Sequence, residues 1–137
     1  MRGEPGRVSG LPDKAVAESR ERVRAALGDR LSSTVVVVSS KSGSTVETDS
    51  QRRAFEHAFR EAGLHPTRHM VFVTDPGSPL DVQAREAGFR VVNADPDVGG
   101  RYSALTAFGL VPSGLAGADI EQLLDEAETV ADLLAED

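Results

Sequence analysis

Residues 35–48 read VVVVSSKSGSTVET, and this stretch decides the fold. Four consecutive valines are followed by a polar turn, and a helical pattern of apolar residues begins directly after the turn. A continuous apolar run of this kind is typical of a buried strand in a parallel sheet. The order therefore predicts a strand at Val35–Ser39 that leads, through the polar turn, into a helix at about Val46–Ala62.

The turn between that strand and helix, residues 39–45, carries several hydroxyls, one lysine and Gly43. Free backbone N–H groups and the helix dipole make such a helix start favourable for an anion. Gly43 permits a positive φ, so that neighbouring amides can converge. Two interpretations stay open at this point, namely a phosphate cradle and a serine-rich loop with a good helix N-cap. The spacings of a Walker loop and of a dinucleotide fingerprint are absent.

Composition and net charge exclude several kinds of site and partner. The chain has 137 residues, a net charge of −7 and no cysteine, so one acidic domain without disulfides or thiolate metal sites is expected. The acidic balance argues against a general nucleic-acid or anionic-membrane surface. His57, His65 and His69 lack zinc-like spacing, and neither a metal site nor a cofactor is expected. No apolar run suits a membrane span or a signal peptide, which favours a soluble, cytoplasmic domain.

The rest of the chain alternates between strand and helix patterns. Residues 1–12 are expected to form a flexible lead-in with a short extended piece near Arg7–Ser9, and residues 13–137 a single domain. The predicted elements are a helix from Pro12–Asp13 to Gly28, strands at His69–Thr74 and Phe89–Asn93, a short helix over residues 80–87, a helix at Ala104–Leu110, a Pro/Gly-containing connection at Val111–Gly117 and a final helix at about Ile120–Ala135. This alternation requires a parallel sheet with right-handed crossovers. Three strands are fewer than the roughly five or six of such sheets, so the domain is expected to be partial.

Some side chains leave alternatives open. Glu47 and Asp49, in the first turn of the second helix, are expected to complement the helix dipole, and the other interpretation is that they orient a ligand or Lys41. The final helix carries an apolar stripe that either joins the core or faces a partner. Its members are Ile120, Leu123, Leu124, Ala127, Val130, Ala131 and Leu134.

The loop after the third strand is a second candidate for chemistry. Loops that follow parallel strands meet at the carboxyl edge of the sheet, so the serine-rich turn, Thr74–Ser78 and Gly99–Ser103 are expected to face one crevice. Gly99 and Gly100 let the backbone approach a ligand closely. Arg101 could stabilise an oxyanion, pair with phosphate, or bond the last carbonyls of the sheet.

Two segments of the chain resemble signature stretches of a known family. SSKSGSTVET at 39–48 and VGGRYSALTAFGLVPSGLAGAD at 98–119 are similar, in order and separation, to segments of glucose-6-phosphate isomerase. The first is shared with many sugar isomerase (SIS) domains, and the second is more specific. The resemblance covers roughly residues 8–125 and is close to the actinobacterial type, some members of which are fused to a transaldolase. It implies an α/β, SIS-type, flavodoxin-like three-layer sandwich with a parallel sheet, truncated at its first strand.

The resemblance also implies roles for individual residues. Ser40, Lys41, Ser42 and Thr45 would hold the 6-phosphate of the sugar, and Gly100 and Arg101 would lie beside C1 and C2, with Arg101 stabilising an enediolate-like intermediate. The implied reaction is the aldose–ketose isomerisation of glucose 6-phosphate and fructose 6-phosphate, in glycolysis and gluconeogenesis. A homodimer and the remainder of an isomerase chain are the implied partners. Departures from the family are small, with Ser44 in place of a common threonine and Pro96 in place of a frequent acidic residue.

Other parts of the family's machinery have no match in the sequence. The glutamate that moves the proton lies in an E-S-x-G-K setting, whereas Glu18-Ser19 is followed by Arg20-Glu21. The ring-opening histidine, the late lysine and the first-strand phosphate loop also find no matching segment. The chain alone is therefore expected to lack isomerase activity. The alternatives are a non-catalytic sugar-phosphate-sensing SIS domain of a regulator and a structural remnant that binds nothing.

Overall fold

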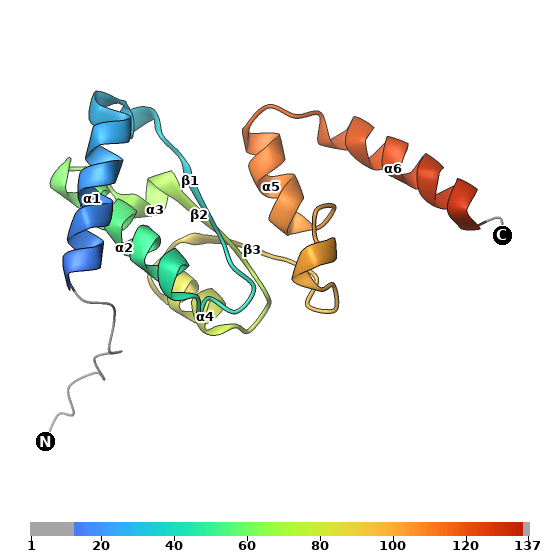
Figure 1. The fold of residues 1–137 in the computed structure, drawn as a ribbon, viewed down its shortest axis with the longest axis horizontal. Coiled ribbons are helices and arrows are strands. Elements are labelled where there is room, and N and C mark those ends of the chain that lie inside the picture. Colours follow the sequence, from blue (N-terminus) through green and yellow to red (C-terminus); the bar gives the residue numbers. More distant parts are fainter. Residues whose placement is uncertain (1–12, 136–137) are drawn as a thin grey trace, which may run out of the picture.

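A computed structural model describes residues 13–135 of the chain (Figure 1). Its elements are α1 (Asp13–Leu27), a 3₁₀ helix (Gly28–Ser33), β1 (Val36–Ser39), α2 (Val46–Glu61), α3 (Pro66–His69), β2 (Met70–Thr74), α4 (Pro79–Glu86), β3 (Arg90–Asn93), a 3₁₀ helix (Gly100–Tyr102), α5 (Ala107–Leu115) and α6 (Ile120–Ala135). Within this part of the chain no helix combines the length and the apolar character needed to cross a membrane. The predicted lead-in at 1–12, with its extended piece near Arg7–Ser9, lies outside the described residues.

The three strands form one parallel sheet in the order β1-β2-β3. Val38 of β1 is in register with Phe72 of β2, and Phe72 is in register with Val91 of β3. Each strand is joined to the next by a helix, as parallel pairing requires. The predicted α/β class with a parallel sheet is confirmed, and each strand begins within one residue of its predicted start.

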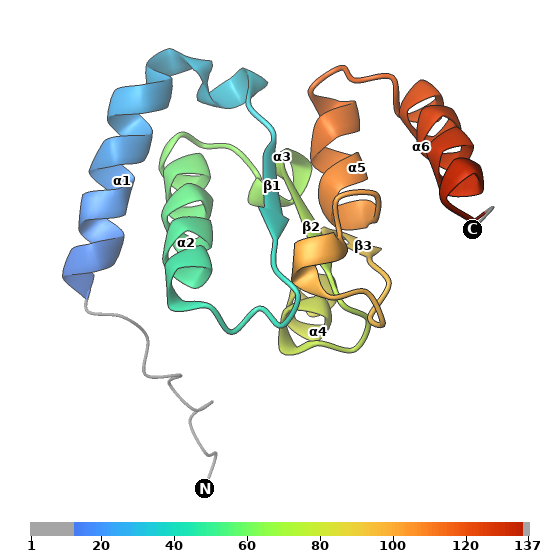
Figure 2. The same ribbon diagram turned by 45° about the vertical axis from the view of Figure 1, so that its right-hand side comes forward.

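Helices cover both faces of this sheet (Figures 1 and 2). On one face, α2 and α4 pack against the strands and enclose the core formed by Val38, Phe59, Met70, Phe72, Leu80 and Ala84. Further out, α1 packs along α2, and Arg20 and Arg24 of α1 bind Glu61 at N–O distances of 2.7 and 2.6 Å. On the other face, α5 lies against β2, whose Val73 is fully buried. The central strand, β2, is thus the most deeply buried strand of the sheet.

The helix after β3 differs from the prediction. A helix at Ala104–Leu110 and a connection at Val111–Gly117 were expected, but α5 spans Ala107–Leu115 and contains Pro112. Pro112 removes one backbone donor, which ordinarily disfavours a helix interior. The helix is closely surrounded at two glycines, because a Cβ on Gly109 would lie 1.9 Å from the Ala104 carbonyl oxygen and one on Gly114 would lie 2.3 Å from Ile120 Cδ1. The two glycines therefore let α5 sit tightly between the preceding loop and α6.

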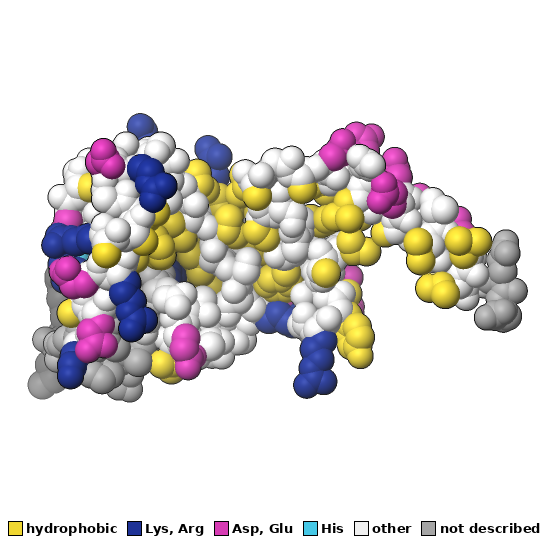
Figure 3. Space-filling view, turned by 45° about the horizontal axis from the view of Figure 1, so that its top comes forward, with side chains coloured by type: hydrophobic (Ala, Val, Ile, Leu, Met, Phe, Trp, Pro, Cys, Tyr) yellow, Lys and Arg dark blue, Asp and Glu magenta, His cyan; other side chains and the backbone are white. Residues whose placement is uncertain are grey.

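The last helix, α6, extends beyond the sheet (Figure 2). Asp119 caps it as predicted, since Asp119 Oδ1 accepts a hydrogen bond from the Gln122 N–H at 3.0 Å. Its apolar stripe does not join the described core, because Val130 is 55% exposed and Leu134 is 75% exposed. Figure 3 shows these hydrophobic side chains on one side of the helix and the acidic side chains on another. Of the two interpretations of the stripe, a core role within residues 13–135 is excluded.

Candidate functional site

The three strands end at the same edge of the sheet, and the loops that follow them are bonded to one another. The Ser40 N–H donates to the Val73 carbonyl at 3.0 Å, and the Asp75 N–H donates to the Lys41 carbonyl at 3.2 Å. The Ala94 N–H donates to the Thr74 carbonyl at 3.0 Å. These bonds continue the ladder of the sheet beyond the last paired residues, so the three loops begin side by side at this edge. That they face one crevice stays a prediction.

The serine-rich loop after β1 is shaped by its own hydroxyls. Ser40 Oγ accepts from the Gly43 N–H at 3.1 Å, and Ser42 Oγ accepts from the Ser44 N–H at 3.2 Å. Thr45 is the N-cap residue of α2, but its side chain makes no capping hydrogen bond. The hydroxyl of Thr45 and the first turn of α2 therefore leave polar groups at the helix start that a side-chain cap does not satisfy. This arrangement differs from the well-capped loop that was one of the two interpretations.

Gly43 is required at its position for two independent reasons. Its φ is +71°, in the left-handed region that side chains other than glycine rarely adopt. A Cβ on Gly43 would also lie 2.3 Å from Leu80 Cβ, at the start of α4. The serine-rich loop is thus packed directly on a residue of the hydrophobic core, which fixes its position relative to the sheet.

The Lys41 side chain points toward the other two loops. Its ammonium donates to Asp75 Oδ1 at 3.1 Å and to the Val98 carbonyl at 2.9 Å. The same nitrogen lies 5.6 Å from the ring centre of Phe108 in α5. These partners could not be found from the sequence, because Asp75 belongs to a turn 34 residues away and Val98 accepts through its backbone carbonyl. Lys41 is the side chain that links all three loops.

Gly100 and Arg101 lie in the 3₁₀ helix that follows β3. A Cβ on Gly100 would be 3.8 Å from Lys41 Cδ, so the Gly100 backbone lies beside the lysine stem. The loop is held by the Tyr102 N–H, which donates to the Gly99 carbonyl at 2.9 Å, and by Ser103 Oγ, which donates to the Gly100 carbonyl at 2.7 Å. Arg101 itself is exposed to solvent. The structure therefore brings Ser40, Lys41 and Gly100 to one edge, with Arg101 on the same loop.

A buried polar network beneath this edge was not predicted. Ser78 Oγ accepts from the Asp81 N–H at 3.1 Å and lies 2.8 Å from Thr74 Oγ1. The Asp81 carboxylate accepts from the Gly77 N–H at 2.8 Å and from Arg85 Nε at 2.7 Å. The hydrogen bond from the Gly77 amide, together with Arg85, lowers the pKa of Asp81 below its ordinary value of 3.8. The spacing S-x-x-D at 78–81 is a capping-box pattern and could have revealed the network.

The two acidic residues at the start of α2 do not contact Lys41. Asp49 pairs with Arg52, whose Nη2 lies 2.6 Å from Asp49 Oδ1, and Glu47 is exposed. Asp75 takes the position beside Lys41 that the alternative interpretation gave to Glu47 or Asp49.

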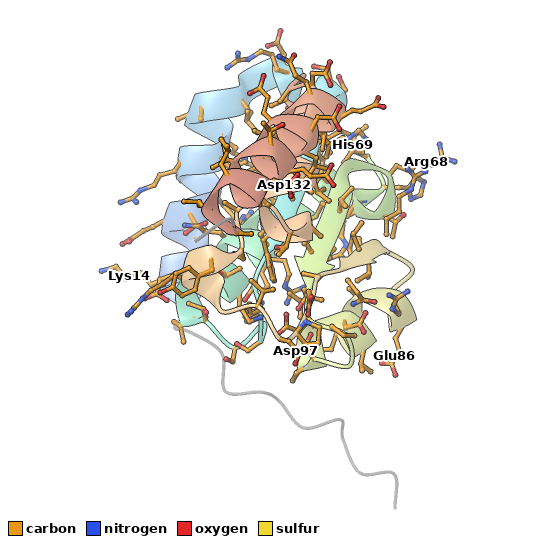
Figure 4. All side chains as sticks on the ribbon, turned by 90° about the vertical axis from the view of Figure 1, so that its right-hand side faces the viewer. Lys14, Arg68, His69, Glu86, Asp97 and Asp132 are labelled. Carbon is orange, nitrogen blue, oxygen red and sulfur yellow. The ribbon has the colours of Figure 1, made fainter. Side chains whose placement is uncertain are left out.

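Figure 4 shows Asp97, in the loop after β3, at the end of the sheet where the three loops meet.

Comparison with known proteins finds similar sequences among the glucose-6-phosphate isomerases. No protein-family model matches the chain. Glucose-6-phosphate isomerase of Synechococcus sp. is 42% identical over 119 residues, which cover 86% of this chain and 22% of the relative. That of Thermosynechococcus vestitus is 47% identical over 105 residues, which cover 76% of this chain and 20% of the relative.

The chain matches one section of glucose-6-phosphate isomerase.

Solved structures agree with this similarity. A glucose-6-phosphate isomerase from Chlamydia trachomatis is 36% identical, with a TM-score of 0.58 over 69% of this chain and 19% of that one. A hypothetical protein from Thermus thermophilus is 35% identical, with a TM-score of 0.68 over 82% of this chain and 27% of that one. The resemblance carried by the two sequence motifs is confirmed. The chain spans about a fifth of the length of the curated isomerases, between 20% and 22% of the first three.

Proposed function

We propose that this chain is the central part of the first SIS domain of a glucose-6-phosphate isomerase and that the loops at its strand ends form part of the sugar-phosphate site. One observation carries the proposal. The two segments whose motifs resemble the isomerase family, 39–48 and 98–119, are joined at the carboxyl edge of the sheet by the hydrogen bond from Lys41 to Val98. That edge is where open α/β sheets bind ligands.

The serine-rich loop would hold the phosphate. Ser40, Ser42 and Thr45 supply hydroxyls, and the first turn of α2 supplies unsatisfied N–H groups and the positive end of the helix dipole. Gly43 lets the loop adopt the conformation in which these groups lie together. A local site of this kind is compatible with a chain of net charge −7, because hydrogen bonds to a phosphate act at short range.

The loop after β3 would contact the reacting end of the sugar. Gly100 presents backbone without a side chain, and Arg101 would place a guanidinium beside the oxygen that becomes negative in an enediolate-like intermediate. A fixed cation at such a position lowers the barrier because it is already oriented when the charge develops.

The isomerisation of glucose 6-phosphate to fructose 6-phosphate also needs a base that carries a proton between C2 and C1. The sequence contains no glutamate in the family's setting, so the base would come from another part of an isomerase. We therefore expect the 137-residue chain by itself to bind the sugar phosphate without converting it. Cytoplasmic location, a homodimer and a place in glycolysis and gluconeogenesis belong to the same proposal.

A chimeric enzyme tests this function. Residues 8–125 would replace the matching section of the Synechococcus isomerase, and conversion of fructose 6-phosphate to glucose 6-phosphate would be followed by a coupled assay. We expect an active chimera in which Arg101→Ala lowers kcat about 100-fold or more, as loss of one charge-stabilising donor does. Arg68→Ala, an exposed arginine in α3 ahead of β2, is the matched control and should leave kcat unchanged. A folded chimera without turnover, or one insensitive to Arg101→Ala, would contradict the proposal.

A further inference from the structure

Lys41 is bonded to the other strand-end loops through both its backbone and its side chain. Its carbonyl accepts from the Asp75 N–H at 3.2 Å and from Thr74 Oγ1 at 3.0 Å. Its ammonium donates to Asp75 Oδ1 and to the Val98 carbonyl. The backbone of this one residue therefore fixes the serine-rich loop to the loop after β2, and its side chain extends the connection to the loop after β3.

These contacts determine what the ammonium can do. Two of its three N–H donors are used, and its nitrogen also faces the ring of Phe108. The side chains of Lys41 and Asp75 are 32% and 22% exposed, so the pair is only partly screened by water. Turning the ammonium toward a phosphate in the serine-rich loop would leave the Asp75 carboxylate and the Val98 carbonyl without this donor. Such a loss is costly for partly buried groups.

The loop after β3 has few other ties to the core. Between Ala94, which donates to Thr74, and α5, the hydrogen bonds described for residues 95–106 are bonds within that segment, bonds from the first turn of α5 to Thr106, and the one from Lys41 to Val98. The segment of the loop that carries Gly100 and Arg101 thus depends on Lys41 for its polar connection to the sheet.

We propose that Lys41 is a positioning residue that holds the Arg101 loop over the phosphate loop, and that it is not a direct ligand of the phosphate. The phosphate is then held by the hydroxyls and N–H groups of residues 40–45 alone. This inference deepens the proposed function and rests on it only for the identity of the ligand. The link between the two loops is a property of the ligand-free chain.

The first test needs no ligand. Amide hydrogen exchange at Tyr102, whose N–H donates to the Gly99 carbonyl, reports how firmly the loop is held. In Lys41→Met, which keeps the apolar stem, we expect exchange at Tyr102 to rise about tenfold. Lys14→Met, at the other lysine of the sequence, is the matched control, because Lys14 is exposed to solvent on α1, a helix that packs along α2. Unchanged exchange at Tyr102 in Lys41→Met would overturn the proposal.

A second variant, Asp75→Asn, shows whether the effect of Lys41→Met comes from the lost contacts or from misfolding. Asp75→Asn removes the charge partner of Lys41 but leaves the bond to Val98, so exchange at Tyr102 should rise by a smaller factor than in Lys41→Met. Circular dichroism would first show that Asp75→Asn is folded. If this variant raises hydrogen exchange at Tyr102 as much as Lys41→Met does, or more, the link does not run through Val98 and the proposal fails.

The second test separates a positioning role from a ligand role. Dissociation constants of inorganic phosphate and of fructose 6-phosphate would be measured for the chain and for Lys41→Met. We expect phosphate binding to change less than about threefold, while the advantage of fructose 6-phosphate over phosphate falls about tenfold. An equal, large loss for both probes would show that the ammonium binds phosphate directly and would overturn the inference. If the unaltered chain binds neither probe, the proposed function fails for this chain and hydrogen exchange decides the link between the loops.

Discussion

The two parts of the chain that supply the candidate site differ in how they are supported. The part from β1 to β3 encloses a core in which Phe59 and Val73 are fully buried and Phe72 is 1% exposed. The part from Gly100 to Ala135 contains no buried residue in either α5 or α6, and Leu133 and Leu134 are 68% and 75% exposed. The serine-rich loop belongs to the first part and the Arg101 loop to the second.

This difference indicates how precisely each loop is placed. Gly43 packs on Leu80, so the serine-rich loop is held against the core. The Arg101 loop is connected to the sheet through Ala94 and through Lys41, and its own residues are exposed. One half of the candidate site is therefore fixed by packing, and the other half is held by a few polar contacts. Substitutions can remove these polar contacts selectively.

The largest expected difference in the free energy of unfolding is between a core and a surface side chain. Phe59→Ala should lower the free energy of unfolding by about 3–5 kcal/mol, because it leaves a cavity between α2 and the sheet. Leu134→Ala, in the exposed stripe of α6, should change it by less than about 0.5 kcal/mol. Urea denaturation followed by circular dichroism measures both values. A cost at Leu134 close to that at Phe59 would show that α6 is buried in solution.

Gly43, the glycine of the serine-rich loop, should be the next most sensitive position. Gly43→Ala combines a positive φ with an overlap on Leu80, and we expect a loss of about 2–4 kcal/mol of unfolding free energy. Gly28→Ala has a similar φ, +51°, but open space around it, so its cost should be only about 1–2 kcal/mol. Thermal and urea unfolding of the two variants give the comparison. Equal costs would mean that the loop is not packed on α4 as described.

The polar network under the site should produce the smallest effect, seen as a dependence on pH. Because the folded-state pKa of Asp81 is lowered, its contribution is fully present above the unfolded-state pKa and is lost as the pH falls through the folded value. Asp81→Asn should therefore reduce the loss of stability on acidification below about pH 4. Asp132→Asn, on exposed α6, is the control. Unfolding curves at several pH values would contradict this account if both variants kept the same acid dependence as the unaltered chain.

Much of the fold could be predicted from local patterns. The four valines before Ser39 and the apolar face with Phe59 identify β1 and α2, because burial imposes a period on the sequence. The end of α5 could not be predicted in this way, since Pro112 and Gly114 are typical of a connection, whereas the helix continues through both to Leu115 and lies close to Ala104 and Ile120.

For the candidate site, too, local sequence predicts only part of what the structure shows. The residue types at 39–45 and 99–101 predict an anion-binding loop and a cation beside two glycines, and parallel topology brings both loops to one edge. The partners of Lys41 could not be predicted, because they lie 34 and 57 residues away and one is a backbone carbonyl. Local sequence thus specifies which groups are available, whereas tertiary packing specifies which groups they meet.

The most direct test of the divided site is an NMR titration of the chain with fructose 6-phosphate, with inorganic phosphate and fructose as controls. We expect phosphate to shift the amides of residues 40–45 and fructose to shift none of the site amides. Fructose 6-phosphate should shift residues 40–45 together with Gly100 and Arg101. If fructose 6-phosphate at millimolar concentration shifts neither loop, or shifts the first without the second, the two loops do not form one sugar-phosphate site in this chain.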